Sequence, residues 1–149
     1  MNAWTHSHVP KLKKIKYRAR EGGAITALQL VFNYNEIAGG PCVWDSGADG
    51  NHVSNWQTYT LPTNRGKHTG FKIKVIEEEG VAAIHKLECK FAGGNNSEVF
   101  CGTGPHQNQG HNIDWAEEHY LVGMYCDKMT LEGKKVLAKV GFITARVLP

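Results

Sequence analysis

The stretch Ala83-Ile84-His85-Lys86-Leu87-Glu88-Cys89-Lys90-Phe91 decides the fold, because its second half alternates apolar and charged residues and the stretch has a counterpart earlier in the chain. Leu87, Cys89 and Phe91 share one face of an extended strand, and the charged residues between them share the other. Shifting the chain by 59 residues places the stretch on residues 24–32 without a gap. This coincidence predicts a repeated β unit.

The match at this shift extends well beyond the strand itself. Across positions 24 to 56 there are seven identities, and several involve the uncommon residues Trp, Cys and His. Ala24, Ile25, Leu28, Phe32, Cys42, His52 and Trp56 fall on Ala83, Ile84, Leu87, Phe91, Cys101, His111 and Trp115. Upstream, residues 14–17 also resemble residues 72–75, both alternating lysine with apolar residues. The chain therefore contains at least two copies of one pattern.

A fainter third copy begins with Val136 and Leu137, which follow Ala83 and Ile84 at a shift of 53 residues. One unit exposes an apolar strand face that it cannot cover alone, whereas three units around an axis can bury these faces against one another. We therefore predict an all-β fold in which three repeated units close a shared three-sheet core. Residues 1–149 form one domain in this prediction, with repeats at 4–55, 56–114 and 115–149.

Equivalent positions of the three units should lie in equivalent layers of the core. We expect one layer to hold Leu28, Leu87 and Val140, and another to hold Phe32, Phe91 and Thr144. We also expect the segment around Trp4 and residues 145–149 to complete the third sheet.

Composition and charge narrow the class of protein. The chain has 149 residues, 41% of them hydrophobic and 21% charged, which is typical of a globular domain. Its apolar runs are much shorter than the roughly 18 residues that a membrane-spanning helix needs. Residues 11–20 contain six basic residues and no acidic one, but Ile15, Tyr17 and Ala19 alternate with them, as in a strand with one solvated face. We therefore expect no nucleic-acid partner, while this stretch keeps a membrane surface as a candidate partner.

These units resemble those of the jacalin-like lectins, a β-prism family. Residues 84–91 are similar to the family's Ile-x-x-Leu-x-Phe-x-Thr strand, and Tyr120-Leu121-Val122-Gly123 and Val140-Gly141-Phe142-Ile143-Thr144 resemble it again. The resemblance implies an all-β, threefold-repeated β-prism of about 10 to 12 strands in three Greek-key-like sheets. It also implies a secreted or extracellular, non-enzymatic carbohydrate-binding module that needs no cofactor. Its partners would be glycans or glycoproteins, and a second copy of the chain is a further candidate.

The resemblance also indicates which end of the prism should bind a ligand. Mannose-binding members of the family carry Gly-x-x-x-Asp just before a strand, but Gly23, Ala82 and Lys135 occupy the acidic position here. We therefore expect a different site at the same end, where turns between paired strands gather and offer carboxylates and backbone amides. The candidate ligand-binding residues in these turns are Glu21, Gly22, Gly23, Glu79, Gly80, Asp127 and Lys128.

A second candidate site is the motif His-x-x-(Asn/Asp)-Trp, which occurs twice. The first copy consists of His52, Asn55 and Trp56, and the second of His111, Asp114 and Trp115. An indole can stack on the apolar face of a sugar while His and Asn or Asp bind its hydroxyls. The alternative interpretation is structural, with the tryptophans in the core and the polar pair bracing a loop.

Other chemistry has less support in the sequence. The eight histidines and four cysteines show no spacing typical of a metal site, so no metal is expected. One or two disulfides and four reduced thiols are both compatible with the cysteine positions. No Gly-x-Ser-x-Gly motif is present. The alternative function is a protein- or membrane-interaction module of a toxin, an egg coat or another extracellular assembly.

Overall fold

A computed structural model describes residues 8–19, 24–33, 42–45, 56–78, 81–93, 97–101, 111–131 and 134–147. These residues form ten β-strands and no helix. The strands are β1 (Leu12–Ala19), β2 (Ile25–Phe32), β3 (Cys42–Asp45), β4 (Gln57–Thr60), β5 (His68–Glu78), β6 (Val81–Phe91), β7 (Ser97–Cys101), β8 (His111–Asp114), β9 (His119–Leu131) and β10 (Lys134–Arg146).

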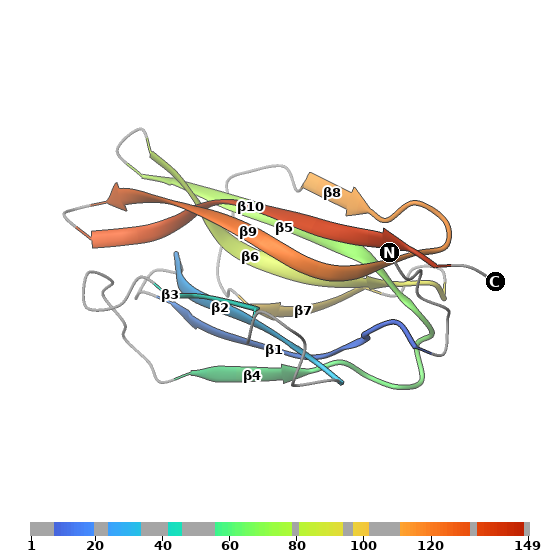
Figure 1. Ribbon diagram of the computed structural model, residues 1–149. Coiled ribbons are helices and arrows are strands. Elements are labelled where there is room, and N and C mark those ends of the chain that lie inside the picture. The colour runs from blue at the N-terminus through green and yellow to red at the C-terminus, as the bar shows by residue number, and fades with distance from the viewer. Residues whose placement is uncertain are drawn as a thin grey trace.

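The strands form three antiparallel sheets that face one another (Figure 1). Two sheets have four strands each, in the orders β3-β2-β1-β4 and β7-β6-β5-β8, and the third consists of β10 and β9. In both four-stranded sheets a long central hairpin is flanked by a short strand on each side. The prediction of an all-β prism with three sheets is confirmed.

The three central hairpins are built alike, because each contains two register shifts at corresponding positions. In the second strand of each hairpin one residue is skipped in the pairing: Thr26, His85 and Ala138. In the first strand of each hairpin another is skipped: Lys13, Thr69 and Val122. Such β-bulges increase the local twist of a strand, and here they bend the three hairpins in the same way.

The bulges show which residues of the three sheets are equivalent. Leu28, Leu87 and Val140 each follow a skipped residue by two positions, so they lie in equivalent layers as predicted. Phe32 and Phe91 pair with Leu12 and His68, and Thr144 pairs with Leu121, immediately beside the second bulge. The predicted second layer is thus confirmed as well.

The sequence parallel between residues 14–17 and 72–75 is out of register with the structure. Ile15 pairs with Leu30, and the residue equivalent to Leu30 in the second unit is Cys89. Because Cys89 pairs with Phe71, Ile15 corresponds to Phe71 and not to Ile73. The error is a shift of two residues. Because side chains alternate with a period of two, such a shift keeps the same residues facing the core and is invisible in the pattern.

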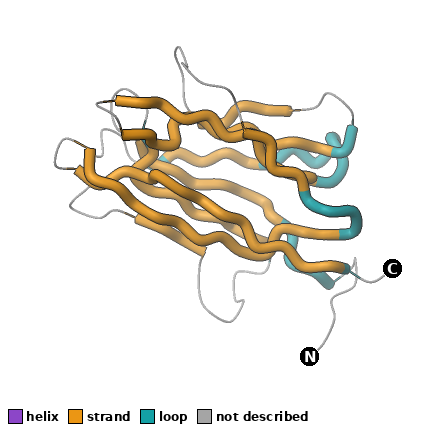
Figure 2. Tube along the Cα trace, turned by 90° about the horizontal axis from the view of Figure 1, so that it is seen from above, coloured by secondary structure: helices purple, strands orange, loops and turns teal. Residues whose placement is uncertain are grey.

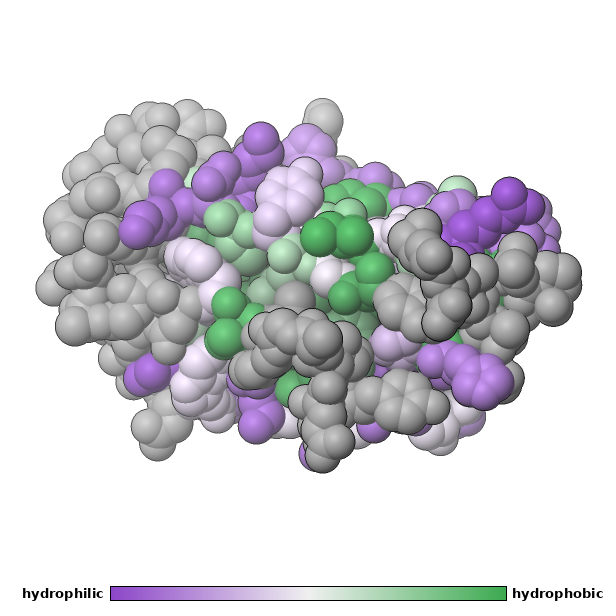
Figure 3. Space-filling model, in the orientation of Figure 1, coloured by the Kyte–Doolittle hydropathy of each residue, from purple (hydrophilic) through white to green (hydrophobic). Residues whose placement is uncertain are grey.

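The core lies between the three sheets and is filled by the inward faces of the hairpins. Its buried residues come from all three sheets: Ile15, Ile25, Leu28, Leu30, Phe32, Leu61, Phe71, Ile73, Ile84, Leu87, Cys89, Phe91, Leu121 and Leu137. On the face seen in Figure 3, hydrophobic side chains gather toward the middle, between the β9–β10 sheet and the β1–β4 sheet, and hydrophilic ones lie toward the margins.

The basic stretch at residues 11–20 forms β1, as predicted, but its alternation is only partly realised. Ile15 is fully buried and Lys14 is exposed, whereas Lys16, Tyr17 and Arg18 are all half-buried. The reason is that β1 is a central strand with β2 on one side and β4 on the other, whose side chains flank its outer face. None of the described residues forms an apolar helix of membrane-spanning length.

The third sheet has two strands among the described residues. Residues 145 and 146 belong to β10, whereas Trp4, residue 148 and residue 149 lie outside the described residues. The proposed completion of this sheet and the repeat boundaries stay predictions.

Candidate functional site

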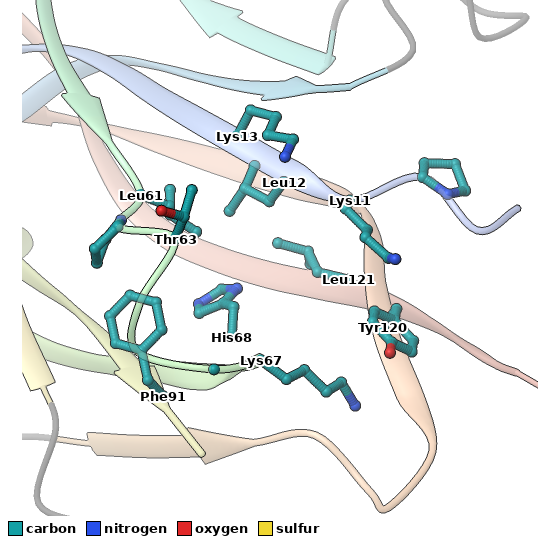
Figure 4. A pocket seen from close by; sticks show the side chains of 13 residues that line it. Lys11, Leu12, Lys13, Leu61, Thr63, Lys67, His68, Phe91, Tyr120 and Leu121 are labelled. Carbon is teal, nitrogen blue, oxygen red and sulfur yellow. The ribbon is translucent and has the colours of Figure 1, made fainter. Parts of the chain in front are cut away.

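A pocket of about 380 Å³ lies at the end of the prism where β1, β5 and β9 begin. Figure 1 shows these strand ends, and Figure 4 shows the residues that line the pocket. Most of the described loops lie at this end as well (Figure 2). The volume of the pocket falls in the range of small-molecule binding sites. The pocket is lined by Pro10, Lys11, Leu12, Lys13, Leu61, Pro62, Thr63, Gly66, Lys67, His68, Phe91, Tyr120 and Leu121.

The pocket arises because equivalent positions of the three hairpins converge. Leu12, His68 and Leu121 pair with the residues of the second core layer, so they lie at the same height along the prism. That layer consists of Phe32, Phe91 and Thr144. All three line the pocket, as do the residues that immediately precede them in the sequence, Lys11, Lys67 and Tyr120. The floor therefore contains two leucines and a histidine, and the rim contains two lysines and a tyrosine.

His68 is the polar member of the inner set. Its ring packs edge-on against Phe71, at a centroid distance of 4.6 Å, and against Trp115 at 5.8 Å. Nε2 of His68 is buried without a hydrogen-bond partner among the described residues. Burial lowers the pKa of His68 to about 4, against a smaller raising effect from a hydrogen bond with the Gly70 backbone, and the charge of Lys67 lowers it further. At neutral pH the pocket thus contains an uncharged imidazole.

Lys67 lies on the rim beside Tyr120, toward the side of the pocket to which Lys11 also points (Figure 4). Its Nζ donates a hydrogen bond to the carbonyl oxygen of His119 and lies 4.2 Å from the centroid of the Tyr120 ring. Burial lowers the pKa of the Lys67 ammonium. The side chain is therefore held in place by a carbonyl and an aromatic face instead of a carboxylate.

The turns predicted to bind a ligand lie elsewhere or outside the described residues. Glu21, Gly22, Gly23, Glu79 and Gly80 are outside them, so their role stays a prediction. Asp127 and Lys128 were expected in a turn, but both are exposed residues within β9, paired with Lys139 and Leu137. The strand continues to Leu131 because the ladder with β10 extends that far. Lys128 lies eight residues from Tyr120, or roughly 26 Å along the strand.

The two copies of the His-x-x-(Asn/Asp)-Trp motif are not equivalent in the structure. Trp56 precedes β4, whereas Trp115 follows β8 and donates its backbone N–H to Thr69. In the first sheet the corresponding hydrogen bond is made by Leu61, whose backbone N–H donates to the carbonyl oxygen of Lys13. His52 and Asn55 lie outside the described residues. Equal spacing in the sequence thus places the two tryptophans at opposite ends of corresponding strands.

The described residues of these motifs have separate surroundings. Trp115 is half-buried against the core and contacts Phe142 as well as His68. Asp114 is exposed and forms an ion pair with Lys90, with 2.6 Å between its Oδ1 and Nζ. His111 is exposed at the start of β8. Trp56 is half-buried, and the Arg18 guanidinium lies 5.7 Å from its ring centroid. Of these residues, Trp115 borders the pocket through its ring contact with His68.

Metal and thiol chemistry is limited in the described part of the chain. It contains no group of three or more His, Cys, Asp or Glu side chains that could hold a metal ion. Cys89 is a buried reduced thiol and Cys126 a half-buried one. The side chains of Cys42 and Cys101 lie outside the description.

The fold is similar to that of solved lectin structures. Over 97% of this chain, it matches a jacalin–melibiose complex (16% identity, TM-score 0.54) and frutalin from Artocarpus incisa in complex with galactose (14%, 0.56), covering 95% of each of those chains. It also matches an artocarpin–mannotriose complex at 13% identity and a TM-score of 0.60, over 97% of this chain and 86% of that one. No protein-family model matches the sequence, and a search of curated proteins finds no match. The fold is therefore the β-prism of jacalin-like lectins, as the sequence resemblance implied.

The pocket was not predicted from the sequence. Lys11 was noticed only as part of a basic strand, and Lys67 and His68 belong to no motif. A signal did exist at one position, because His68 occupies the place that a leucine takes in both other sheets. That signal can be read only once the bulges have established which positions correspond.

Proposed function

We propose that this chain is a non-enzymatic carbohydrate-binding module whose ligand occupies the pocket at the beginning of β1, β5 and β9. The observation that carries the proposal is the composition of this pocket, which has an apolar floor and a rim of hydrogen-bonding groups. A sugar ring presents apolar C–H faces and hydroxyls at its edge, so it is complementary to such a surface. The sugar complexes among the similar structures support the same class of ligand.

The floor and rim have distinct roles in this proposal. Leu61, Phe91 and Leu121 are buried and provide the apolar surface against which a ring can pack. Thr63 is exposed on the loop between β4 and β5, and Tyr120 is half-buried opposite it, so each can offer a hydroxyl to the ligand. These groups come from three different segments of the chain, which gives the pocket a shape that no single loop could form.

Glycan-array binding provides the test. We expect the protein to bind a subset of immobilised glycans and the variant Thr63→Phe to lose this binding, because a benzyl group on this exposed lining residue would fill the pocket without entering the core. Tryptophan fluorescence supplies a second readout in solution, since Trp115 borders His68.

The matched control is Thr58→Phe, which adds the same group to an exposed position of β4 outside the pocket. It should retain binding. Binding that survives in Thr63→Phe would move the site away from this pocket, and a folded protein that binds no glycan in either assay would contradict the carbohydrate function itself.

A further inference from the structure

The lining of the pocket has an unbalanced charge. Three of its thirteen residues are lysines, Lys11, Lys13 and Lys67, and none is aspartate or glutamate. Lys11 and Lys67 immediately precede equivalent positions in β1 and β5, so the convergence of the hairpins brings two ammonium groups to the same rim. An anion bound at this rim could pair with both ammonium groups.

Lys67 is positioned to contact such an anion. An ammonium group has three hydrogen-bond donors, and one of them bonds to the carbonyl oxygen of His119. The Tyr120 ring holds the same group from one side, so the side chain is partly immobilised before a ligand arrives. No described carboxylate forms an ion pair with it. Two donors therefore remain for a ligand.

The interior of the pocket adds a neutral polar group below this rim. Nε2 of His68 is buried without a hydrogen-bond partner among the described residues, which is unfavourable unless a ligand or water bonds to it. Figure 4 shows the His68 ring between Phe91 on the left and Leu12 and Leu121 on the right. The side chains of Lys67 and Lys11 extend on the right of the same view. A ligand that fits this arrangement carries a hydrogen-bonding, otherwise apolar ring and an anionic substituent at its edge.

Resting on the carbohydrate function proposed above, we propose that the pocket selects acidic sugars: hexose units with a carboxylate or sulfate group that pairs with Lys67 and Lys11. Hydrogen bonds between an ammonium and an anion are roughly twice as strong as neutral ones. A neutral sugar can pack against the apolar floor but brings no anionic group to pair with the two lysines. Charge, more than the arrangement of hydroxyls, is the basis of selection.

The test compares ligands that differ in one group. Isothermal titration calorimetry with methyl β-D-glucuronide and methyl β-D-glucoside isolates the effect of the carboxylate, because the rest of the two molecules is the same. We expect the glucuronide to bind at least about tenfold more tightly. Methyl β-D-glucoside 6-sulfate shows whether sulfate can replace the carboxylate, and sodium sulfate shows what the anion contributes without a sugar.

Variants then assign the effect to the rim. Lys67→Met and Lys11→Met each remove a charge while keeping a long side chain, and each should reduce glucuronide affinity by about tenfold, a larger loss than the same variant causes for the glucoside. Lys139→Met is the matched control, because Lys139 is an exposed residue of β10 outside the pocket. It changes the net charge equally and should leave both affinities unchanged. Should Lys67→Met fail to fold, Lys11→Met still tests the proposal, since Lys11 is exposed.

The possible results separate this inference from the function on which it rests. Equal affinity for glucuronide and glucoside would overturn the selection of acidic sugars and leave carbohydrate binding intact. Binding of sodium sulfate as tight as that of the glucuronide would also overturn it, because the site would then recognise an anion only. Loss of affinity in Lys139→Met equal to that in Lys67→Met would attribute the effect to net charge and contradict the assignment to this rim.

Discussion

Gly70 shows how a single residue permits two strands to approach each other. It lies in β5 and pairs with Lys90 of β6 on one side and with Asp114 of β8 on the other. A Cβ atom at this position would overlap the carbonyl oxygen of Ile113. The missing side chain also leaves room for the Lys90–Asp114 ion pair, which spans the central strand at this level.

We expect Gly70→Ala to lower the free energy of unfolding by about 1–3 kcal/mol, because β8 must shift away from β5 to accommodate the methyl group. Urea denaturation followed by tryptophan fluorescence measures the change. The control is Gly141→Ala, because the three atoms nearest to its Cβ all belong to the side chain of Tyr125, which is 56% exposed and can rotate toward solvent. A larger loss in the control than at Gly70 would show that the β5–β8 approach is not the constraint.

At the scale of elements, the three central hairpins carry matching bulges and place matching residues in the core. Leu28 and Leu87 are each 1% exposed, whereas Val140 is only half-buried. Among the described residues, the first two hairpins are flanked by short strands on both sides, and the third hairpin forms a two-stranded sheet.

Leu28→Ala and Leu87→Ala should each lower the free energy of unfolding by about 2–5 kcal/mol, because each removes a fully buried side chain and leaves a cavity. Val140→Ala should lower it by about 1 kcal/mol, since fewer apolar atoms lose their contacts. Chemical denaturation of the three variants compares them directly. Clearly unequal losses for the two leucines would argue against equivalent layers.

At the scale of the whole molecule, the buried His68 links stability to pH. Its pKa is lowered to about 4, chiefly by burial, while an unfolded histidine titrates near 6.5. Between these values the unfolded chain binds a proton that the folded chain does not, so the free energy of unfolding falls as the pH falls from about 6.5 to about 4. The loss from this residue is at most about 3 kcal/mol.

We expect His68→Leu to remove this component, because leucine is the residue at the matching positions Leu12 and Leu121. Urea denaturation at several pH values between 4 and 7 compares the variant with the unmodified protein, which share all other titrating groups. The stability difference between the two proteins should change in favour of the variant as the pH falls. A difference that is constant across this range would show that His68 titrates normally in the folded state.

The sequence predicted the strands, the sheets and the equivalent core layers, because these follow from local alternation and from a shift of 59 residues that any reader of the chain can measure. It did not predict which residues of the three hairpins correspond, and therefore lie at the same height along the prism. Ile15 was paired with Ile73 instead of Phe71, and Trp115 was matched with Trp56 although the structure matches it with Leu61. The first error is a shift of two residues and preserves the facing of side chains, whereas the second is a shift of five residues and does not.

The amino-acid pattern by itself thus determined that this chain forms β units that bury their apolar faces against one another, because one hairpin cannot cover its own apolar face. The resemblance to jacalin-like lectins added the arrangement as a prism. Only the tertiary structure decided where a ligand can bind. Lys11, Lys67 and Tyr120 are more than fifty residues apart from one to the next, and no local pattern relates them. They share a rim because bulges align the first strands of three hairpins around one axis, and that alignment depends on how all three sheets pack together.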